Sequence, residues 1–155
     1  MPFMMIAGSA DAIIPYEAHA ATIPQKSPQS LLVTLQGGTH VGFASIASSL
    51  MRWLHHPDEL ACPMVLSGLD NGDAPAEEML LPDADIGISA DAAMPCTMTE
   101  FDRAMRPGEQ QMLTRLAMLS FLESVFAADP ARRALMETFL TRELAQEQSS
   151  VVLSM

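Results

Sequence analysis

Asp11 and His40 are the residues of this sequence whose types and spacing could do chemistry together. Asp11 ends the segment Gly8-Ser9-Ala10-Asp11, His40 ends Gly37-Gly38-Thr39-His40, and each segment follows a short apolar run. Imidazole is the usual general base near neutral pH, and a carboxylate on its far nitrogen fixes the tautomer and stabilises the imidazolium that forms. The two residues are therefore a candidate acid–base pair that would activate a nucleophile.

Two predicted strands would position this pair. Residues 3–7 and 31–35 are nearly continuous apolar runs, as in parallel strands buried on both faces, and residues 16–23 fit a helical crossover between them. Parallel strands end at the same edge of a sheet, which is where open α/β folds place their chemistry. We therefore expect an α/β fold in which Asp11 and His40 face each other.

The two turns resemble the C-terminal part of an α/β-hydrolase. The stretch Pro2-Phe3-Met4-Met5-Ile6-Ala7-Gly8-Ser9-Ala10-Asp11-Ala12-Ile13-Ile14-Pro15 and the stretch Gly37-Gly38-Thr39-His40-Val41-Gly42-Phe43 are similar to the dienelactone hydrolase, acetylhydrolase and chlorophyllase-like esterases. In that family, a Gly-x-x-Asp turn holds the triad acid and a Gly-x-x-His turn holds the triad histidine. The resemblance covers residues 2–54 well and 105–145 more weakly. It implies a partial α/β-hydrolase fold with Asp11 and His40 as catalytic residues.

The nucleophile of that family has no counterpart in this sequence. The family's serine lies upstream of the acid, in Gly-x-Ser-x-Gly, and no such pentapeptide occurs here. Ser9, Ser45 and Ser67 fall in the acid loop, a predicted helix and an irregular region, so none is placed as a nucleophile. The resemblance implies that the chain is the last third or half of a hydrolase and is inactive alone.

Such a fragment would expose an apolar sheet edge. Strand 3–7 would lie where the family places a further strand beside it, and unpaired edges aggregate or recruit partners. We expect the chain to need the N-terminal half or to self-associate, unless residues 57–100 cover the edge.

The net charge of −11 comes from one segment, which limits the classes of partner. An acidic surface disfavours nucleic acid, no apolar run is long enough for a membrane span, and the start lacks the features of a signal peptide. A solvated loop is the simplest interpretation of the segment, and a Ca²⁺ site around Asp70-Asn71-Gly72-Asp73 is the alternative. Residues 57–102 contain no Lys or Arg and these acids: Asp58, Glu59, Asp70, Asp73, Glu77, Glu78, Asp83, Asp85, Asp91, Glu100 and Asp102.

Cys62 and Cys96 bracket most of this acidic segment. A disulfide between them would close a loop of roughly 35 residues and imply an oxidising compartment. Two free thiols are the alternative, and the sequence does not decide between them.

The chain divides into four parts within one incomplete domain. Residues 1–56 form the strand–helix–strand–helix core, with an apolar stripe predicting a helix over 41–55. Residues 57–100 are an acidic, Pro/Gly-rich insertion that is irregular apart from a short strand at 64–67. Residues 101–146 are closing helices, with an N-cap at 99–102, a largely buried helix from Pro107 to about Ala128, and a helix capped by Asp129. Residues 147–155 are a tail.

The sequence thus favours the C-terminal portion of a serine hydrolase that acts on small carboxylic esters without a cofactor or metal. The alternative is a non-catalytic binding or regulatory module, derived from a hydrolase, that uses its acidic segment.

Overall fold

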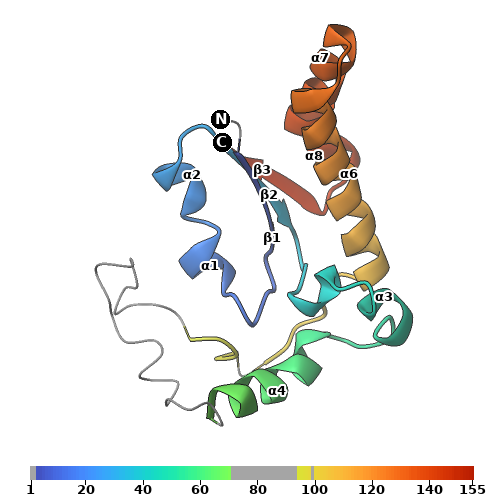
Figure 1. The fold of residues 1–155 in the computed structure, drawn as a ribbon. Coiled ribbons are helices and arrows are strands. Elements are labelled where there is room, and N and C mark those ends of the chain that lie inside the picture. Colours follow the sequence, from blue (N-terminus) through green and yellow to red (C-terminus); the bar gives the residue numbers. More distant parts are fainter. Residues whose placement is uncertain (1–2, 71–93, 99) are drawn as a thin grey trace.

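Three strands form one small mixed sheet that positions the predicted pair (Figure 1). The structure, a computed structural model, describes residues 3–70, 94–98 and 100–155. Strands β1 (Phe3–Gly8) and β2 (Ser30–Leu35) are parallel, with Phe3 opposite Ser30 and Gly8 opposite Leu35. Both predicted strands are therefore confirmed, and both end at the same edge of the sheet.

The third strand was not predicted from the sequence. Strand β3 (Val151–Ser154) lies antiparallel to β2 on the side away from β1. The residues interpreted as a tail therefore complete the sheet. Among the described residues no strand pairs with the outer edge of β1, so that edge is open as expected.

The crossover from β1 to β2 is made of two short helices rather than one. Helices α1 (Tyr16–His19) and α2 (Ile23–Lys26) are separated by a turn, and proline stands in the first turn of α2. Proline suits that position because it has no N–H to place in the helix. These helices lie on one side of the sheet, and helix α6 (Pro107–Phe126) lies on the other.

The predicted helix over 41–55 is wrong. The chain forms a 3₁₀ turn η1 (Val41–Phe43) and a single helical turn α3 (Ala47–Leu50), with an extended residue at Ala44 between them. The side-chain amide of Gln111 donates to the carbonyl oxygens of Gly42 and Ala44, at 3.3 and 2.7 Å. A side chain of the distant helix α6 thus satisfies these two carbonyl groups. They therefore do not continue a helix of their own.

Only part of the apolar stripe of that segment faces the core. Trp53 is 82% exposed and Leu50 is 71% exposed, whereas Phe43 packs against the core. The predicted helix over 41–55 would pack Trp53 with the rest of the apolar stripe, and the structure shows that this expectation is wrong.

Helix α4 (Asp58–Asp70) replaces the expected irregular chain and the expected strand at 64–67. Asp58 and Glu59 stand in its first turn, where acidic side chains are favoured by the helix dipole. Pro63 lies inside the helix and removes one backbone donor without ending it. The rest of the predicted insertion up to residue 93 lies outside the described residues.

Residues 101–106 are not helical, so the predicted start of a helix around Phe101 is wrong. The Phe101 ring instead packs edge-on against His56, with ring centroids 4.9 Å apart. Helix α6 begins at Pro107, as predicted.

Helix α6 is more exposed than its apolar sequence predicted. Leu113 and Ala117 are fully buried and form part of the core with Leu35, Leu140 and Leu144. Several other apolar side chains of α6 face solvent: Met112, Leu116, Met118, Leu119, Leu122 and Phe126. The described chain covers these side chains only in part.

Asp129 caps the next helix as predicted. Its side chain accepts the N–H of Ala131, and α7 (Pro130–Thr138) continues through the π-helical turn η2 (Phe139–Glu143) into α8 (Leu144–Glu147). Arg132 of α7 donates to Glu123 of α6, and this hydrogen bond holds the pKa of the Glu123 carboxyl below its usual value. Within the described ranges, no helix has the length and apolar character that a membrane span requires.

Candidate active site

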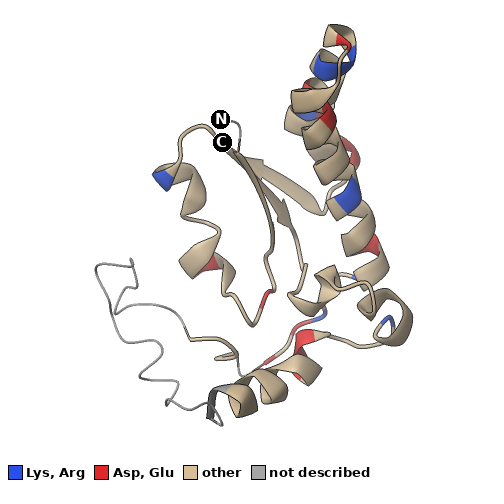
Figure 2. Ribbon diagram, in the orientation of Figure 1, with Lys and Arg blue, Asp and Glu red and all other residues tan. Residues whose placement is uncertain are grey.

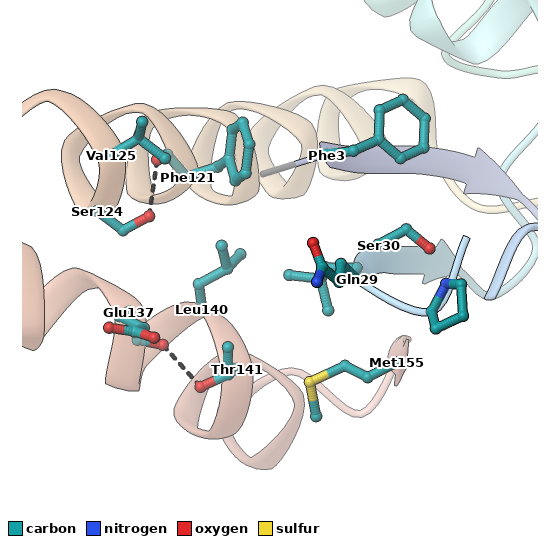
Figure 3. A pocket seen from close by; sticks show the side chains of 12 residues that line it. Phe3, Gln29, Ser30, Phe121, Ser124, Val125, Glu137, Leu140, Thr141 and Met155 are labelled. Atoms are coloured by element: carbon teal, nitrogen blue, oxygen red, sulfur yellow. Dashed lines mark hydrogen bonds between the residues drawn. The ribbon is translucent and has the colours of Figure 1, made fainter. Parts of the chain in front are cut away.

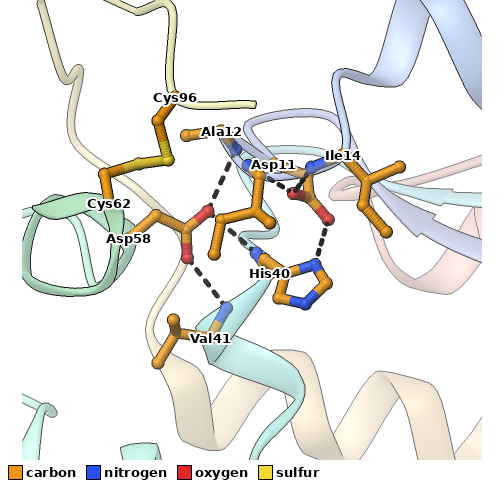
Figure 4. Close-up of a disulfide and its surroundings, with 9 residues drawn as sticks. Asp11, Ala12, Ile14, His40, Val41, Asp58, Cys62 and Cys96 are labelled. Carbon is orange, nitrogen blue, oxygen red and sulfur yellow. Dashed lines mark hydrogen bonds and ion pairs between the residues drawn. A yellow bond between two sulfur atoms is a disulfide. The ribbon is translucent and has the colours of Figure 1, made fainter. Parts of the chain in front are cut away.

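Asp11 and His40 meet just beyond the ends of β1 and β2. Asp11 Oδ2 lies 3.1 Å from His40 Nδ1 (Figure 4). The Asp11 side chain is 10% exposed and the His40 side chain is 41% exposed. His40 Nε2 has no hydrogen-bond partner within the described part of the chain, so the second ring nitrogen is open to another reactant.

The second carboxylate oxygen of Asp11 fixes the orientation of the first. Asp11 Oδ1 accepts the backbone N–H groups of Ile13 and Ile14 at 2.9 and 2.7 Å. This local turn is typical of aspartate and holds the carboxylate through two backbone donors. A carboxylate held in this way is oriented to accept a hydrogen bond from the Nδ1–H of His40.

The two loops that carry the pair pack backbone to backbone. A Cβ atom on Gly8 would lie 2.3 Å from the carbonyl oxygen of Gly38, so only glycine allows this approach. Gly37 has a φ of +74°, which is a conformation that glycine adopts without strain. The Gly37 N–H donates to Ser9 Oγ at 2.8 Å. Ser9 is therefore a structural link between the loops.

Helix α6 clamps the residue that precedes His40. Gln110 Oε1 accepts the N–H of Thr39 at 3.0 Å, and Gln110 Nε2 donates to the Thr39 carbonyl at 2.7 Å. Both side chains are fully buried. The backbone at His40 is thus anchored by an amide from a residue about seventy positions later in the sequence.

Asp58 joins the acid loop to the histidine loop (Figure 4). Its Oδ2 accepts the N–H groups of Ala12 and His40, both at 3.0 Å. Its Oδ1 accepts the N–H of Val41 at 2.8 Å. Asp58 is 0% exposed, so its charge is compensated by these three donors rather than by water.

Sequence reasoning missed this role of Asp58. It counted Asp58 among the charges of a solvated segment, and the tertiary contacts bury it instead. The sequence offers no local signal for this role, because the three donors come from residues that are distant in the sequence.

Cys62 and Cys96 form a disulfide, which decides between the two alternatives left open by the sequence. The bridge connects α4 to a segment whose Cys96 N–H donates to the Ala12 carbonyl at 2.7 Å. Ala12 is therefore held on both of its backbone groups, by Asp58 and by Cys96. The disulfide and Asp58 act on the same loop, directly after Asp11.

An apolar cavity opens beside the pair. Its volume is about 190 Å³, and Asp11 and His40 are among the residues that line it. The other lining residues are mainly apolar: Met5, Ile6, Ala7, Gly8, Ile14, Tyr16, Ala20 and Phe43. Several belong to β1, so the cavity lies along the strand whose outer edge is unpaired.

A larger cavity, of about 430 Å³, lies at the other end of the strands (Figure 3). Its lining includes Phe3 and Ser30, at the starts of β1 and β2. Its hydroxyl groups are already bonded, because Ser124 donates to the Phe121 carbonyl and Thr141 donates to the Glu137 carbonyl. Among the residues that line this cavity, no acid–base pair like that of Asp11 and His40 is present.

Comparison of the chain with protein-family models, with curated proteins and with solved structures finds no match. The geometry of the pair and its supports is therefore the basis for any functional conclusion.

The remaining candidates are placed as follows. Ser45 is exposed, Ser67 lies on α4, and neither is bonded to the His40 ring. Asn71, Gly72 and Asp73 of the possible Ca²⁺ site lie outside the described residues. Within the described ranges, no group of three His, Cys, Asp or Glu side chains is arranged to hold a metal ion.

Proposed function

We propose that this chain supplies the acid and the base of a serine hydrolase that cleaves carboxylic esters. The observation that carries the proposal is the 3.1 Å contact between Asp11 Oδ2 and His40 Nδ1, with Nε2 open beside an apolar cavity. This arrangement of carboxylate, imidazole and strand ends supports the resemblance to the C-terminal part of an α/β-hydrolase.

The roles of the two side chains follow from the chemistry of acyl transfer. Asp11 accepts a hydrogen bond from the Nδ1–H of His40, which keeps the ring proton on Nδ1 and leaves the Nε2 lone pair free to take a proton from a serine hydroxyl. The serine oxygen bonds to the acyl carbon, the bond to the alcohol oxygen breaks, and the alcohol leaves with the proton from Nε2. Water then hydrolyses the acyl-enzyme by the same base.

The serine in this proposal comes from a polypeptide segment outside these 155 residues. The sequence has no Gly-x-Ser-x-Gly, and within the described chain no serine is bonded to His40. The unpaired edge of β1 and the exposed apolar side chains of α6 are surfaces that such a segment would cover. When that segment is absent, we expect the chain to self-associate, with a second copy covering the same surfaces.

The isolated chain is expected to be inert toward esters. Incubation with p-nitrophenyl acetate should give no turnover above that of His40→Ala, and a fluorophosphonate probe should label no serine, as measured by intact-protein mass spectrometry. His19→Ala is the matched control for loss of a histidine. A labelled serine whose labelling requires His40 would show that the nucleophile lies within this chain and would contradict the proposal.

Sequencing the DNA around the coding region tests where the nucleophile comes from. An in-frame Gly-x-Ser-x-Gly upstream, or a neighbouring gene that encodes one, supports the proposal. Co-expression of that segment should then restore turnover, and His40→Ala should abolish it. A stop codon and promoter directly upstream, with no such gene nearby, would favour the non-catalytic module instead.

A further inference from the structure

Another, smaller cavity does not include the pair in its lining and is lined by three arginines. Its volume is about 150 Å³, and Arg52, Trp53 and His55 line it from one segment while Arg103 and Arg106 line it from another. Figure 2 shows basic positions on the loop after α3 and on the segment leading into α6. We propose that this cavity binds a phosphate group.

The backbone that carries these arginines is fixed. The Ala104 N–H donates to the His55 carbonyl at 2.9 Å, which joins the two segments, and the Met105 N–H donates to the Gly37 carbonyl at 2.7 Å. His56, which follows His55, and Met105, which stands just before Arg106, are both buried. The cavity therefore lies between two segments whose backbones are held in place by hydrogen bonds.

Among the described residues, no anionic side chain is paired with the cations at this cavity. Within the described residues, no side-chain oxygen forms an ion pair or hydrogen bond with Arg52, Arg103 or Arg106. Glu100 and Asp102 lie close in the sequence, are exposed, and are not paired with these arginines. By contrast, Arg132 is paired with Glu123. Three of the chain's eight Lys and Arg residues thus share one cavity in a protein of net charge −11.

The exposed Trp53 belongs to the same feature. The Arg52 guanidinium lies over the Trp53 ring, 4.9 Å from its centroid, a cation–π contact that orients the arginine. Because Trp53 is 82% exposed, core packing does not account for its position. The chain contains no other tryptophan, so its fluorescence reports on this cavity alone.

Phosphate fits these observations better than other anions. Guanidinium groups bind phosphate oxygens through paired hydrogen bonds, and a dianion offsets repulsion among three cations more fully than a carboxylate does. Arg106 also precedes α6, whose positive dipole end adds to the field there. The strongly negative chain repels a long polyanion, so a single phosphate group is the expected ligand.

The test is a titration of Trp53 fluorescence with inorganic phosphate at constant ionic strength. We expect a saturable change with a dissociation constant on the order of 1 mM, and little response to acetate or chloride. Arg103→Gln and Arg106→Gln should each weaken binding at least about tenfold, as the loss of one charge-assisted contact predicts. Arg142→Gln, an exposed arginine on η2, is the matched control and should bind as the wild type does.

Vesicles distinguish a lipid headgroup from a soluble phosphate compound as the source of the phosphate group. Co-sedimentation with phosphatidate vesicles that requires Arg103 and is competed by free phosphate identifies a lipid headgroup. Absence of co-sedimentation, with free phosphate still bound, identifies a soluble phosphate compound. A linear response that is equal for phosphate and acetate, or equal losses in Arg103→Gln and Arg142→Gln, would overturn the proposal. None of these measurements depends on ester hydrolysis.

Discussion

Replacement of Asp58 with alanine is expected to lower the free energy of unfolding by on the order of 3 kcal/mol. The buried carboxylate accepts three backbone N–H groups, from Ala12, His40 and Val41, and each buried donor left without a partner costs about 1 kcal/mol or more. Urea denaturation of wild type and variant measures the difference.

Glu59→Ala is the matched control for this substitution. Glu59 stands beside Asp58 in the first turn of α4 but is exposed, so its removal should change stability by less than about 0.5 kcal/mol. Asp58→Asn keeps one acceptor oxygen but turns an NH₂ group toward a donor, so its loss should lie between the two. Equal stabilities of Asp58→Ala and Glu59→Ala would show that Asp58 does not hold the two loops together.

Removal of the disulfide is expected to have a similarly large effect. Cys62 and Cys96 are separated by 34 residues, and by the chain-entropy estimate a bridge across such a loop contributes about 3–4 kcal/mol. The double variant Cys62→Ser with Cys96→Ser should lose that amount in urea denaturation. Reduction of the wild type should cause the same loss.

The double variant also separates the effect of the bridge from the effect of the reductant. Its stability should not change when dithiothreitol is added, because it has no disulfide to reduce. A difference of less than about 1 kcal/mol between oxidised wild type and the double variant would contradict a structural role for the bridge.

Local patterns in the sequence were sufficient to predict the parts of the fold that carry the pair. The continuous apolar runs marked β1 and β2, and the shared ends of parallel strands brought Asp11 and His40 together. Asp129 before Pro130 marked a helix start that the structure confirms. Each of these features depends on residues close in the sequence or on a general rule of sheet geometry.

The features that sequence reasoning missed depend on distant contacts. The helix expected over 41–55 is broken because Gln111 binds the Gly42 and Ala44 carbonyls. Asp58 is buried by loops from two other parts of the chain, and no local pattern distinguishes it from its exposed neighbour Glu59. Strand β3 is only four residues long and is defined by its pairing with β2.

Exposure of apolar side chains could not be predicted for a related reason. The apolar sequence of α6 indicates that the helix is covered, but it does not say by which polypeptide. The described chain fully buries Leu113 and Ala117 but covers the other apolar side chains only in part, which is consistent with the proposed requirement for a further segment.

The most direct test of the account is a measurement of the tautomer of the neutral His40 ring in solution. Long-range ¹H–¹⁵N spectra of wild type, with His40→Ala to assign the signals, should show the neutral ring protonated on Nδ1, because Asp11 accepts a hydrogen bond there. Asp11→Asn should change that tautomer, and His19→Ala should not. A ring protonated on Nε2 in the wild type, or a tautomer unaffected by Asp11→Asn, would contradict the proposed acid–base pair.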